Sequence, residues 1–181
     1  TESGQTTQFR YDPAGIRTTV IHPDGSKLLQ PFPHYEEQRA ANGTLLKRRT
    51  SYTLGGQLIA LEEDGTIRYA HNDHLGSPAI LMQKDGNIVL NSTIARYKPY
   101  GGYLTEPTAT VVDRGDTGHD RTAADDGLGL VYMNARYLDS STGRFISADT
   151  LVPDPADPQS FNRYSYVNNR PTAMVDPTGH C

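Results

Sequence analysis

The sequence predicts an all-β fold built from short antiparallel hairpins. Turn dipeptides recur about every 20 residues through the first half of the chain, at Asp24-Gly25, Asn42-Gly43, Asp64-Gly65 and Asp85-Gly86. Such dipeptides supply the positive φ angles that two-residue hairpin turns need. The chain has 11 tyrosines, 4 phenylalanines and no tryptophan, and it has 17 glycines and 12 prolines. Tyrosine suits half-buried sheet surfaces, and glycine and proline suit frequent turns.

The segments between these turns have the alternation of half-buried strands. They cover residues 16–22, 44–54, 56–63, 66–72, 78–84 and 87–100. No segment before residue 120 has a helical stripe of apolar residues. The regular recurrence of a strand–turn–strand unit is typical of a repeat array. In such an array, stacked hairpins bury the faces that one hairpin cannot bury alone. The recurrence fits equally an ordinary antiparallel sandwich with evenly spaced turns.

The second half is less regular. Residues 105–126 are polar and rich in Pro, Gly and Asp, which indicates a long loop. A strand-like segment, "LGLVYMNARYLD", covers residues 128–139, and the turn sequence "SSTGRF" follows it at 140–145. After a Pro- and Asp-rich stretch, "FNRYSYVNN" at 161–169 fits either a short helix or a strand.

Composition excludes several classes of function. The net charge is −4 with the signs interspersed, and the densest basic run is Lys47-Arg48-Arg49. We therefore expect no nucleic-acid partner, since that affinity comes mainly from neutralised phosphates. No apolar run approaches the ~18 residues of a membrane-spanning helix. The single cysteine, Cys181, rules out an internal disulfide framework.

The apolar content is low for a self-contained globular domain. Hydrophobic residues make up 35% of the chain, and the mean hydropathy is −0.61. Apolar burial must offset about 1–2 kcal/mol of backbone entropy for each ordered residue. We therefore expect a chain that shares its core with neighbouring segments or forms a thin wall.

Six motifs, taken in order, resemble the RHS-repeat-associated core domain. This domain is shared by bacterial Rhs polymorphic toxins and the C subunits of insecticidal toxin complexes, and teneurins carry a more distant version. The motifs are "YDPAG" (11–15), "GGQLIAL" (55–61), "HNDHLGSPAIL" (71–81), "YKPYGGYL" (97–104), "GLGLVYMNARYLDSSTGRFISAD" (127–149) and "FNRYSYVNNRPTAMVDPTG" (161–179).

The resemblance implies that YD-repeat hairpins form part of a spiralling hollow shell with an irregular C-terminal plug. Residues 1–104 would be the shell segment, 105–126 a polar loop and 127–181 the plug. The implied partners are the preceding shell and a downstream toxin of the same polypeptide, with secretion-system or toxin-complex subunits. Such a protein would be secreted or displayed at the surface of a bacterium.

The resemblance also implies self-cleavage at the end of the chain. Residues 171–179 match a family pattern of Pro, four residues, Asp-Pro, one residue and Gly, with His180 in a leucine position. Carried over by motif, the catalytic pair is Asp149 and Asp176, Arg144 positions or biases the carboxylates, and the cut falls at His180 and Cys181. Thr150 stands where the family commonly has proline.

This chemistry is physically reasonable, because two carboxylates held close together share one proton, so one can activate water while the other polarises a carbonyl.

Two other interpretations of the chain end stay open. Without the resemblance, however, Asp-Pro-x-Gly is ordinary turn chemistry. Alternatively, the Cys181 thiol attacks the preceding carbonyl in an acyl shift, as in intein-like domains.

The sequence predicts neither a metal nor a cofactor. His71, Asp73, His74 and His119 could face one site, but "DHLGS" is a family hallmark for which a buried hydrogen-bonding role is the better interpretation. The aspartates at 149, 154 and 157 lack EF-hand spacing. The tyrosines at 132, 137, 164 and 166 are interpreted as wall packing. Two rival functions remain: a non-cleaving structural or adhesive module, and a carbohydrate-binding surface made of exposed tyrosines.

Overall fold

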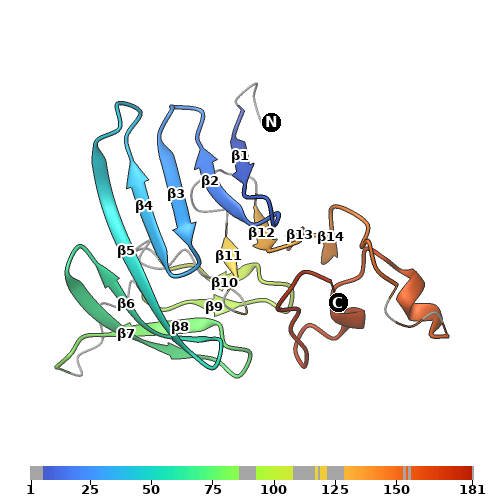
Figure 1. Ribbon diagram of the computed structural model, residues 1–181. Helices are drawn as coiled ribbons and strands as arrows, with labels where there is room; N and C mark the ends of the chain where they lie inside the picture. Colours follow the sequence, from blue (N-terminus) through green and yellow to red (C-terminus); the bar gives the residue numbers. More distant parts are fainter. Residues whose placement is uncertain are drawn as a thin grey trace.

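The computed structural model describes residues 6–85, 93–107, 117, 119–121, 129–152, 154 and 156–180. Within these ranges the chain consists of β-strands and two short 3₁₀ helices, with no α-helix (Figure 1). This confirms the all-β prediction. Over the same ranges, no helix has the length and apolar character needed to cross a bilayer.

The first half forms one eight-stranded antiparallel sheet in which each strand pairs with the next along the chain. Figure 1 shows this sheet curving, with β1–β5 upright and β6–β8 swung beneath them. The strands are β1 (Gln8–Tyr11), β2 (Arg17–Ile21), β3 (Lys27–Phe32), β4 (Tyr35–Arg39), β5 (Leu45–Leu54), β6 (Gln57–Glu63), β7 (Thr66–Asn72) and β8 (Pro78–Met82).

The turns only partly follow the prediction of two-residue hairpins. Asp64-Gly65 is such a turn, with φ angles of 48° and 85°, because Glu63 pairs directly with Thr66. The prediction is wrong for Asp24-Gly25 and Asn42-Gly43, which lie in longer connections where only the glycine has positive φ. There, Asp24 and Asn42 use their side chains to accept backbone hydrogen bonds instead. Gly86 of the fourth dipeptide lies outside the described residues.

A buried arginine joins three neighbouring strands of this sheet. Arg49 on β5 is 6% exposed and pairs across the strands with Glu36 on β4 and Glu63 on β6. Its guanidinium lies 2.8 Å from Glu36 Oε1 and 2.7 Å from Glu63 Oε2. Lys47 adds a contact of 3.4 Å to Glu63. This face of the sheet is therefore held partly by ion pairs rather than by apolar packing alone.

The second half contains two smaller sheets. Strands β9 (Arg96–Tyr97) and β10 (Tyr103–Thr105) form a pair, and β11 (Asp120–Arg121), β12 (Leu130–Met133), β13 (Arg136–Asp139) and β14 (Arg144–Phe145) form a four-stranded sheet. The expected single strand-like segment at 128–139 is instead the β12–β13 hairpin. Its turn is Asn134-Ala135, where Asn134 adopts a φ of 58°.

The main apolar core lies in this second half. The segment at 161–169, which fitted either a helix or a strand, contains the end of one 3₁₀ helix, η3 (Pro158–Phe161), and the whole of a second, η4 (Val167–Asn169). Between them, Ser165 makes one bridge to Arg144 on β14. The core residues, all nearly inaccessible, are Val131, Met133, Leu138, Phe145, Tyr166 and Val167.

Aromatic and cationic side chains join the large sheet to the four-stranded one. The guanidinium of Arg17 on β2 lies 4.4 Å from the ring centroid of Tyr132 on β12. The backbone N–H of Arg17 also donates to the Tyr132 hydroxyl at 2.9 Å. On β1 and β13, the hydroxyls of Tyr11 and Tyr137 lie 3.0 Å apart. These contacts fix the four-stranded sheet, and with it the candidate site, against the first hairpin.

We predict that Arg49→Ala lowers the free energy of unfolding by about 3 kcal/mol, because it removes from two partly buried glutamates the buried cation that they share. The neighbouring Arg48 is exposed on the same strand and serves as the matched control. Arg48→Ala should cost less than about 1 kcal/mol. Urea unfolding of the two variants checks the difference, and equal losses would contradict the proposed weight of the Arg49 ion pairs.

Candidate functional site

The end of the chain folds into a tight turn around Asp176. This side chain is fully buried, and its Oδ1 accepts hydrogen bonds from the backbone N–H groups of Thr178 (3.2 Å), Gly179 (2.8 Å) and His180 (3.1 Å). The local sequence explains the turn, because an aspartate readily caps amides just after it and Gly179 takes a φ of 80°. The turn interpretation of Asp-Pro-x-Gly therefore describes the backbone correctly.

This turn packs directly against the β12–β13 hairpin. Asn134 Nδ2 donates to the Pro177 carbonyl at 2.9 Å, and the Ala135 N–H donates to the Thr178 carbonyl at 3.3 Å. A Cβ at Gly179 would collide with the Met133 carbonyl oxygen and lie 3.0 Å from the Ala135 nitrogen. Only glycine fits at this position, and its presence lets Asp176 reach the interior.

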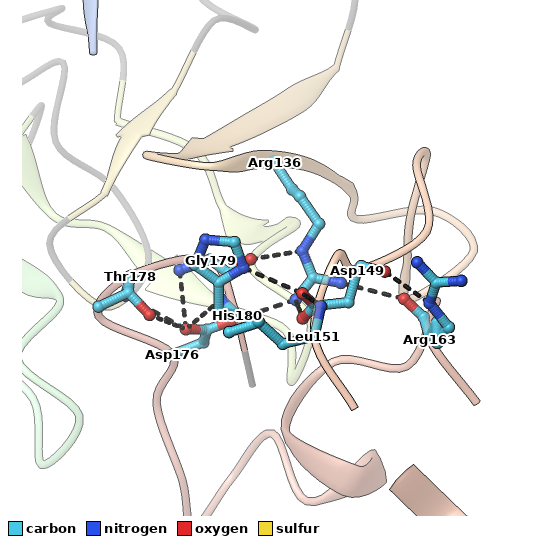
Figure 2. A network of polar contacts seen from close by, with 8 residues as sticks. All are labelled: Arg136, Asp149, Leu151, Arg163, Asp176, Thr178, Gly179 and His180. Carbon is cyan, nitrogen blue, oxygen red and sulfur yellow. Dashed lines mark hydrogen bonds and ion pairs between the residues drawn. The ribbon is translucent and has the colours of Figure 1, made fainter. Parts of the chain in front are cut away.

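The guanidinium of Arg136, on β13, is the centre of the site (Figure 2). Arg136 is 5% exposed and lies 3.5 Å from the centroid of the Phe145 ring. Its Nη2 lies 2.8 Å from Asp149 Oδ2 and 3.6 Å from Asp176 Oδ2. Its Nε donates to the Gly179 carbonyl, and its Nη1 donates to the Arg163 carbonyl at 3.1 Å. One buried cation thus binds both carboxylates and the backbone of the tail.

Asp149 lies in the loop after β14 and is 5% exposed. Its Oδ1 accepts the Leu151 N–H at 2.9 Å and lies 3.0 Å from His180 Nδ1. Its backbone is fixed by Arg163, whose carbonyl accepts from the Asp149 N–H at 2.8 Å and whose Nε donates to the Asp149 carbonyl at 2.5 Å.

The surroundings of Asp149 favour its ionised form. Burial alone would raise the pKa of this carboxyl, but the hydrogen bonds from Leu151 and His180 and the charge of Arg136 outweigh burial. The pKa of Asp149 is therefore held below its ordinary value of 3.8. At neutral pH this carboxylate is a proton acceptor rather than a proton donor.

The structure brings together two of the three residues expected to be catalytic. Asp149 and Asp176 meet at one guanidinium, with His180 beside them. Arg144 is exposed on β14 and pairs with Asp139 in the strand register. Among the described residues, it forms no ion pair with either carboxylate. Cys181 lies outside the described residues.

Sequence reasoning missed Arg136, which takes the position expected of Arg144. A signal for it was present, since Arg136 stands inside the apolar segment 128–139. Arginine is almost never fully buried without acidic partners, so a buried strand carrying one predicts nearby carboxylates.

The residues considered for a metal site have other roles. Asp73 Oδ1 accepts the backbone N–H groups of Leu75 and Ser77 in the turn before β8. His74 is exposed rather than buried, and its Nε2 lies 3.2 Å from the Thr172 carbonyl. His119 Nδ1 lies 2.7 Å from Thr117 Oγ1. In the part of the chain that the structure describes, no three His, Cys, Asp or Glu side chains gather as metal ligands.

We predict that Gly179→Ala undocks the tail, because the added methyl group meets the Met133 backbone. Gly43→Ala is the matched control, since Gly43 has a similar φ of 88° but open space around it. The control should cost about 1 kcal/mol from its backbone conformation alone. Amide hydrogen exchange at residues 178–180 should accelerate at least tenfold only in Gly179→Ala. Unchanged protection there would contradict the tight docking.

We also predict that the stabilising effect of Asp149 disappears in acid. Because the folded-state pKa is lowered, this effect is fully present above the ordinary pKa of 3.8 and is lost as pH falls through the lower folded-state pKa. Wild type should therefore be more stable than Asp149→Asn at pH 7, and the gap should close toward pH 2. Chemical unfolding across this range measures the gap, and a constant gap would contradict an ionised Asp149.

Comparison with known proteins places the chain in a family. A family model described as the teneurin YD-shell matches residues 41–172. A second, described as the RHS repeat, matches residues 1–27. The tRNA3(Ser)-specific nuclease WapA of Bacillus spizizenii is 33% identical over 138 residues, which cover 72% of this chain and 6% of that protein. Toxin protein Tse5 of Pseudomonas aeruginosa is 27% identical over 170 residues, covering 91% of this chain and 12% of that protein.

Solved structures show the same fold. The chain superposes on the crystal structure of TcdB2-TccC3-Cdc42 with a TM-score of 0.77 and 20% identity, covering 99% of this chain and 9% of that one. The chain thus spans between 6% and 12% of the length of these relatives. The matches to both family models and to WapA confirm the resemblance noted in the sequence, and the chain belongs to the teneurin YD-shell family of RHS/YD-repeat proteins.

Proposed function

We propose that this chain closes an RHS-type β shell around a downstream toxin and cuts its own backbone at His180-Cys181 to free that toxin. Residues 1–104 form the shell segment in this proposal, 105–126 the polar loop and 127–181 the plug. The observation that carries the proposal is the meeting of Asp149 and Asp176 on the Arg136 guanidinium, beside the end of the chain.

The proposed chemistry is hydrolysis of one peptide bond by an intramolecular aspartic-type site. Asp149, held ionised, draws a proton from the attacking water. Asp176 holds the terminal turn in place, and its carboxyl group lies against the same guanidinium as Asp149. Because the scissile bond belongs to the same chain, the tether supplies its effective concentration and no separate substrate pocket is needed.

The large sheet supports the shell part of the proposal. Within the described residues, the end strand β1 has one neighbour in the sheet and offers an edge to which further hairpins could pair. The outer edge of β8 is partly covered, because Ala95 donates to the Ala79 carbonyl at 2.9 Å. Large apolar side chains on its strands remain exposed, including Phe32, Leu54 and Tyr69. Such surfaces are expected of a wall segment that neighbouring parts of a longer protein cover.

The names of the relatives support a secreted toxin. Tse5 is described as a toxin protein, and TccC3 is solved together with TcdB2. By analogy, this protein is delivered through a secretion system or a toxin complex. Its partners are then the preceding shell, the enclosed toxin and subunits of the delivery machinery.

A non-cleaving adhesive or carbohydrate-binding module is the second candidate. Tyr52 and Tyr69 support it, because both pair with Ala60 in the sheet register and both remain exposed, at 42% and 44%. Two exposed rings on one sheet face are a common platform for sugars. This candidate requires no cut at the chain end.

We predict that the full-length protein is cut near residues 180–181, and that Asp149→Asn and Asp176→Asn each slow this cut at least about 100-fold. Asp154→Asn is the matched control, since Asp154 is exposed and its carboxylate accepts the Ala156 N–H at 2.9 Å in a local turn. Intact-mass spectrometry of the full-length protein and its variants measures both the site and the extent of cleavage. A wild-type protein that stays intact would favour the non-cleaving module.

Paired arginine variants show which cation serves the site. Arg136→Gln should abolish the cut, because it removes the cation between the two carboxylates. Arg144→Gln should leave cleavage within a few-fold of wild type, because Arg144 is exposed. The opposite result would assign the supporting role to Arg144, as the motif match predicted.

A further inference from the structure

The chain leaves the sheet between the end of β14 and Asp149. The Phe145 N–H, on β14, donates to the Tyr164 carbonyl at 3.0 Å, and the Asp149 N–H donates to the Arg163 carbonyl at 2.8 Å. Residues 146–148 thus lie between two contacts whose partners are consecutive in the chain. In a regular antiparallel ladder one residue stands opposite one residue, so the ladder does not fix the position of Asp149.

Arg163 binds the backbone of Asp149 on both sides of its Cα. The Arg163 carbonyl accepts the Asp149 N–H, and the Arg163 Nε donates to the Asp149 carbonyl at 2.5 Å. The same Arg163 carbonyl also accepts from Nη1 of Arg136 at 3.1 Å. Figure 2 shows Asp149 between Arg163 and the terminal turn that carries Asp176. One residue therefore holds the backbone at the point where the ladder no longer does.

Fixing this backbone fixes the carboxylate that it carries. The Asp149 side chain is short, and its Oδ2 lies 2.8 Å from Nη2 of Arg136. The same Nη2 lies 3.6 Å from Asp176 Oδ2. The separation of the two carboxylates therefore depends on where the Asp149 backbone stands. For groups that must be held in place to react, an error of about 1 Å can cost about 100-fold in rate.

The hydrogen bond from Arg163, rather than its charge, makes this contact. Arg163 is exposed, and its Nε meets a backbone carbonyl instead of a carboxylate. Among the described residues, the basic side chains paired with the Asp149 carboxylate are those of Arg136 and His180. An uncharged N–H donor in the place of the Arg163 Nε should therefore serve nearly as well as the guanidinium.

We propose, on the basis of the self-cleavage proposed above, that Arg163 is a positioning residue for the cut. Its Nε–H bond to the Asp149 carbonyl sets the place of the Asp149 carboxylate relative to Asp176. Arg163 itself takes no part in the chemistry, which stays with the two aspartates. This role belongs to the segment 161–169, to which the sequence alone assigned no function.

Two substitutions of matched length test this role. The amide nitrogen of glutamine lies the same number of bonds from Cα as the Nε of arginine, so Arg163→Gln keeps an N–H donor and loses the charge. Arg163→Met has the same length and no donor. Intact-mass time courses of the full-length protein after short cell-free synthesis should show Arg163→Met cut at least about tenfold more slowly than wild type, and Arg163→Gln within about threefold of it. Equal slowing in both variants would overturn the proposal, because the charge would then be the property that matters.

Amide hydrogen exchange distinguishes positioning from general destabilisation. In Arg163→Met, exchange should accelerate at the N–H groups of Asp149 and Leu151, which are donors within this loop, and stay unchanged in the β12–β13 hairpin. Acceleration in the hairpin as well would overturn a positioning role. Arg170→Met is the matched control, because Arg170 is exposed in the following segment and, among the described residues, its side chain bonds to neither Asp149 nor Arg136. Its cleavage and exchange should both match wild type.

The outcomes separate this proposal from the one on which it rests. A slow cut in Arg163→Met that Arg163→Gln restores, with faster exchange confined to the Asp149 loop, supports both. If Arg163→Met is cut at the wild-type rate while Asp149→Asn is not cut, self-cleavage stands and only the role of Arg163 fails. If the wild-type protein is never cut, both proposals fail.

Discussion

The burial of Arg136 is the constraint on which the C-terminal half depends. A guanidinium with 5% exposure is too costly to leave without anions. It is satisfied by a carboxylate from the loop after β14, by a carboxylate from the tail and by two backbone carbonyls. These partners lie in segments that do not pair with β13 as strands. The guanidinium therefore holds in place loops and a tail that the hydrogen bonds of the sheet do not hold. Removing any one of them would leave buried charge behind, which ties the folding of the tail to the integrity of the site.

The same device appears in the large sheet, where Arg49 lies between Glu36 and Glu63. In both places a buried arginine joins elements that apolar packing alone would hold weakly in a chain with 35% hydrophobic residues. The two arginines differ in where their acidic partners lie in the fold. Arg49 binds residues on the adjacent strands β4 and β6, so it reinforces an existing register. Arg136 binds carboxylates from the loop after β14 and from the tail, neither of which pairs with β13 as a strand, so it creates a tertiary arrangement.

Local chemistry predicted much of the fold and less of the site. Alternation located β2 and β5–β8, but β1, β3 and β4 were missed. The residues of β4 are mostly polar, and the apolar residues of β3 do not alternate with polar ones. The pairing of Asp149 with Asp176 came from the family resemblance, since residue types alone favoured a simple turn. The assignment of Arg144 also came from the family resemblance, which did not single out Arg136. Side chains alternate between faces along a strand, so the register of β13 and β14 determines which arginine faces the core. Arg136 shares the buried face with Leu138 and Phe145, whereas Arg144 pairs with Asp139 on the other face.

The arginine also changes how protons are shared at the site. Two bare carboxylates in contact would force one of them to keep a proton. Here a cation lies against both, and the pKa of Asp149 is lowered rather than raised. Near neutral pH, repulsion between the aspartates therefore gives no strong reason for a shared proton. Hydrolysis still needs a group that accepts a proton and then returns it to the departing amine. The charge of Arg136 that holds the tail also stabilises the ionised form of Asp149, so this carboxylate accepts a proton only weakly. The electrostatics that stabilise the docked tail therefore also determine the protonation state of Asp149 in any reaction at the end of the chain.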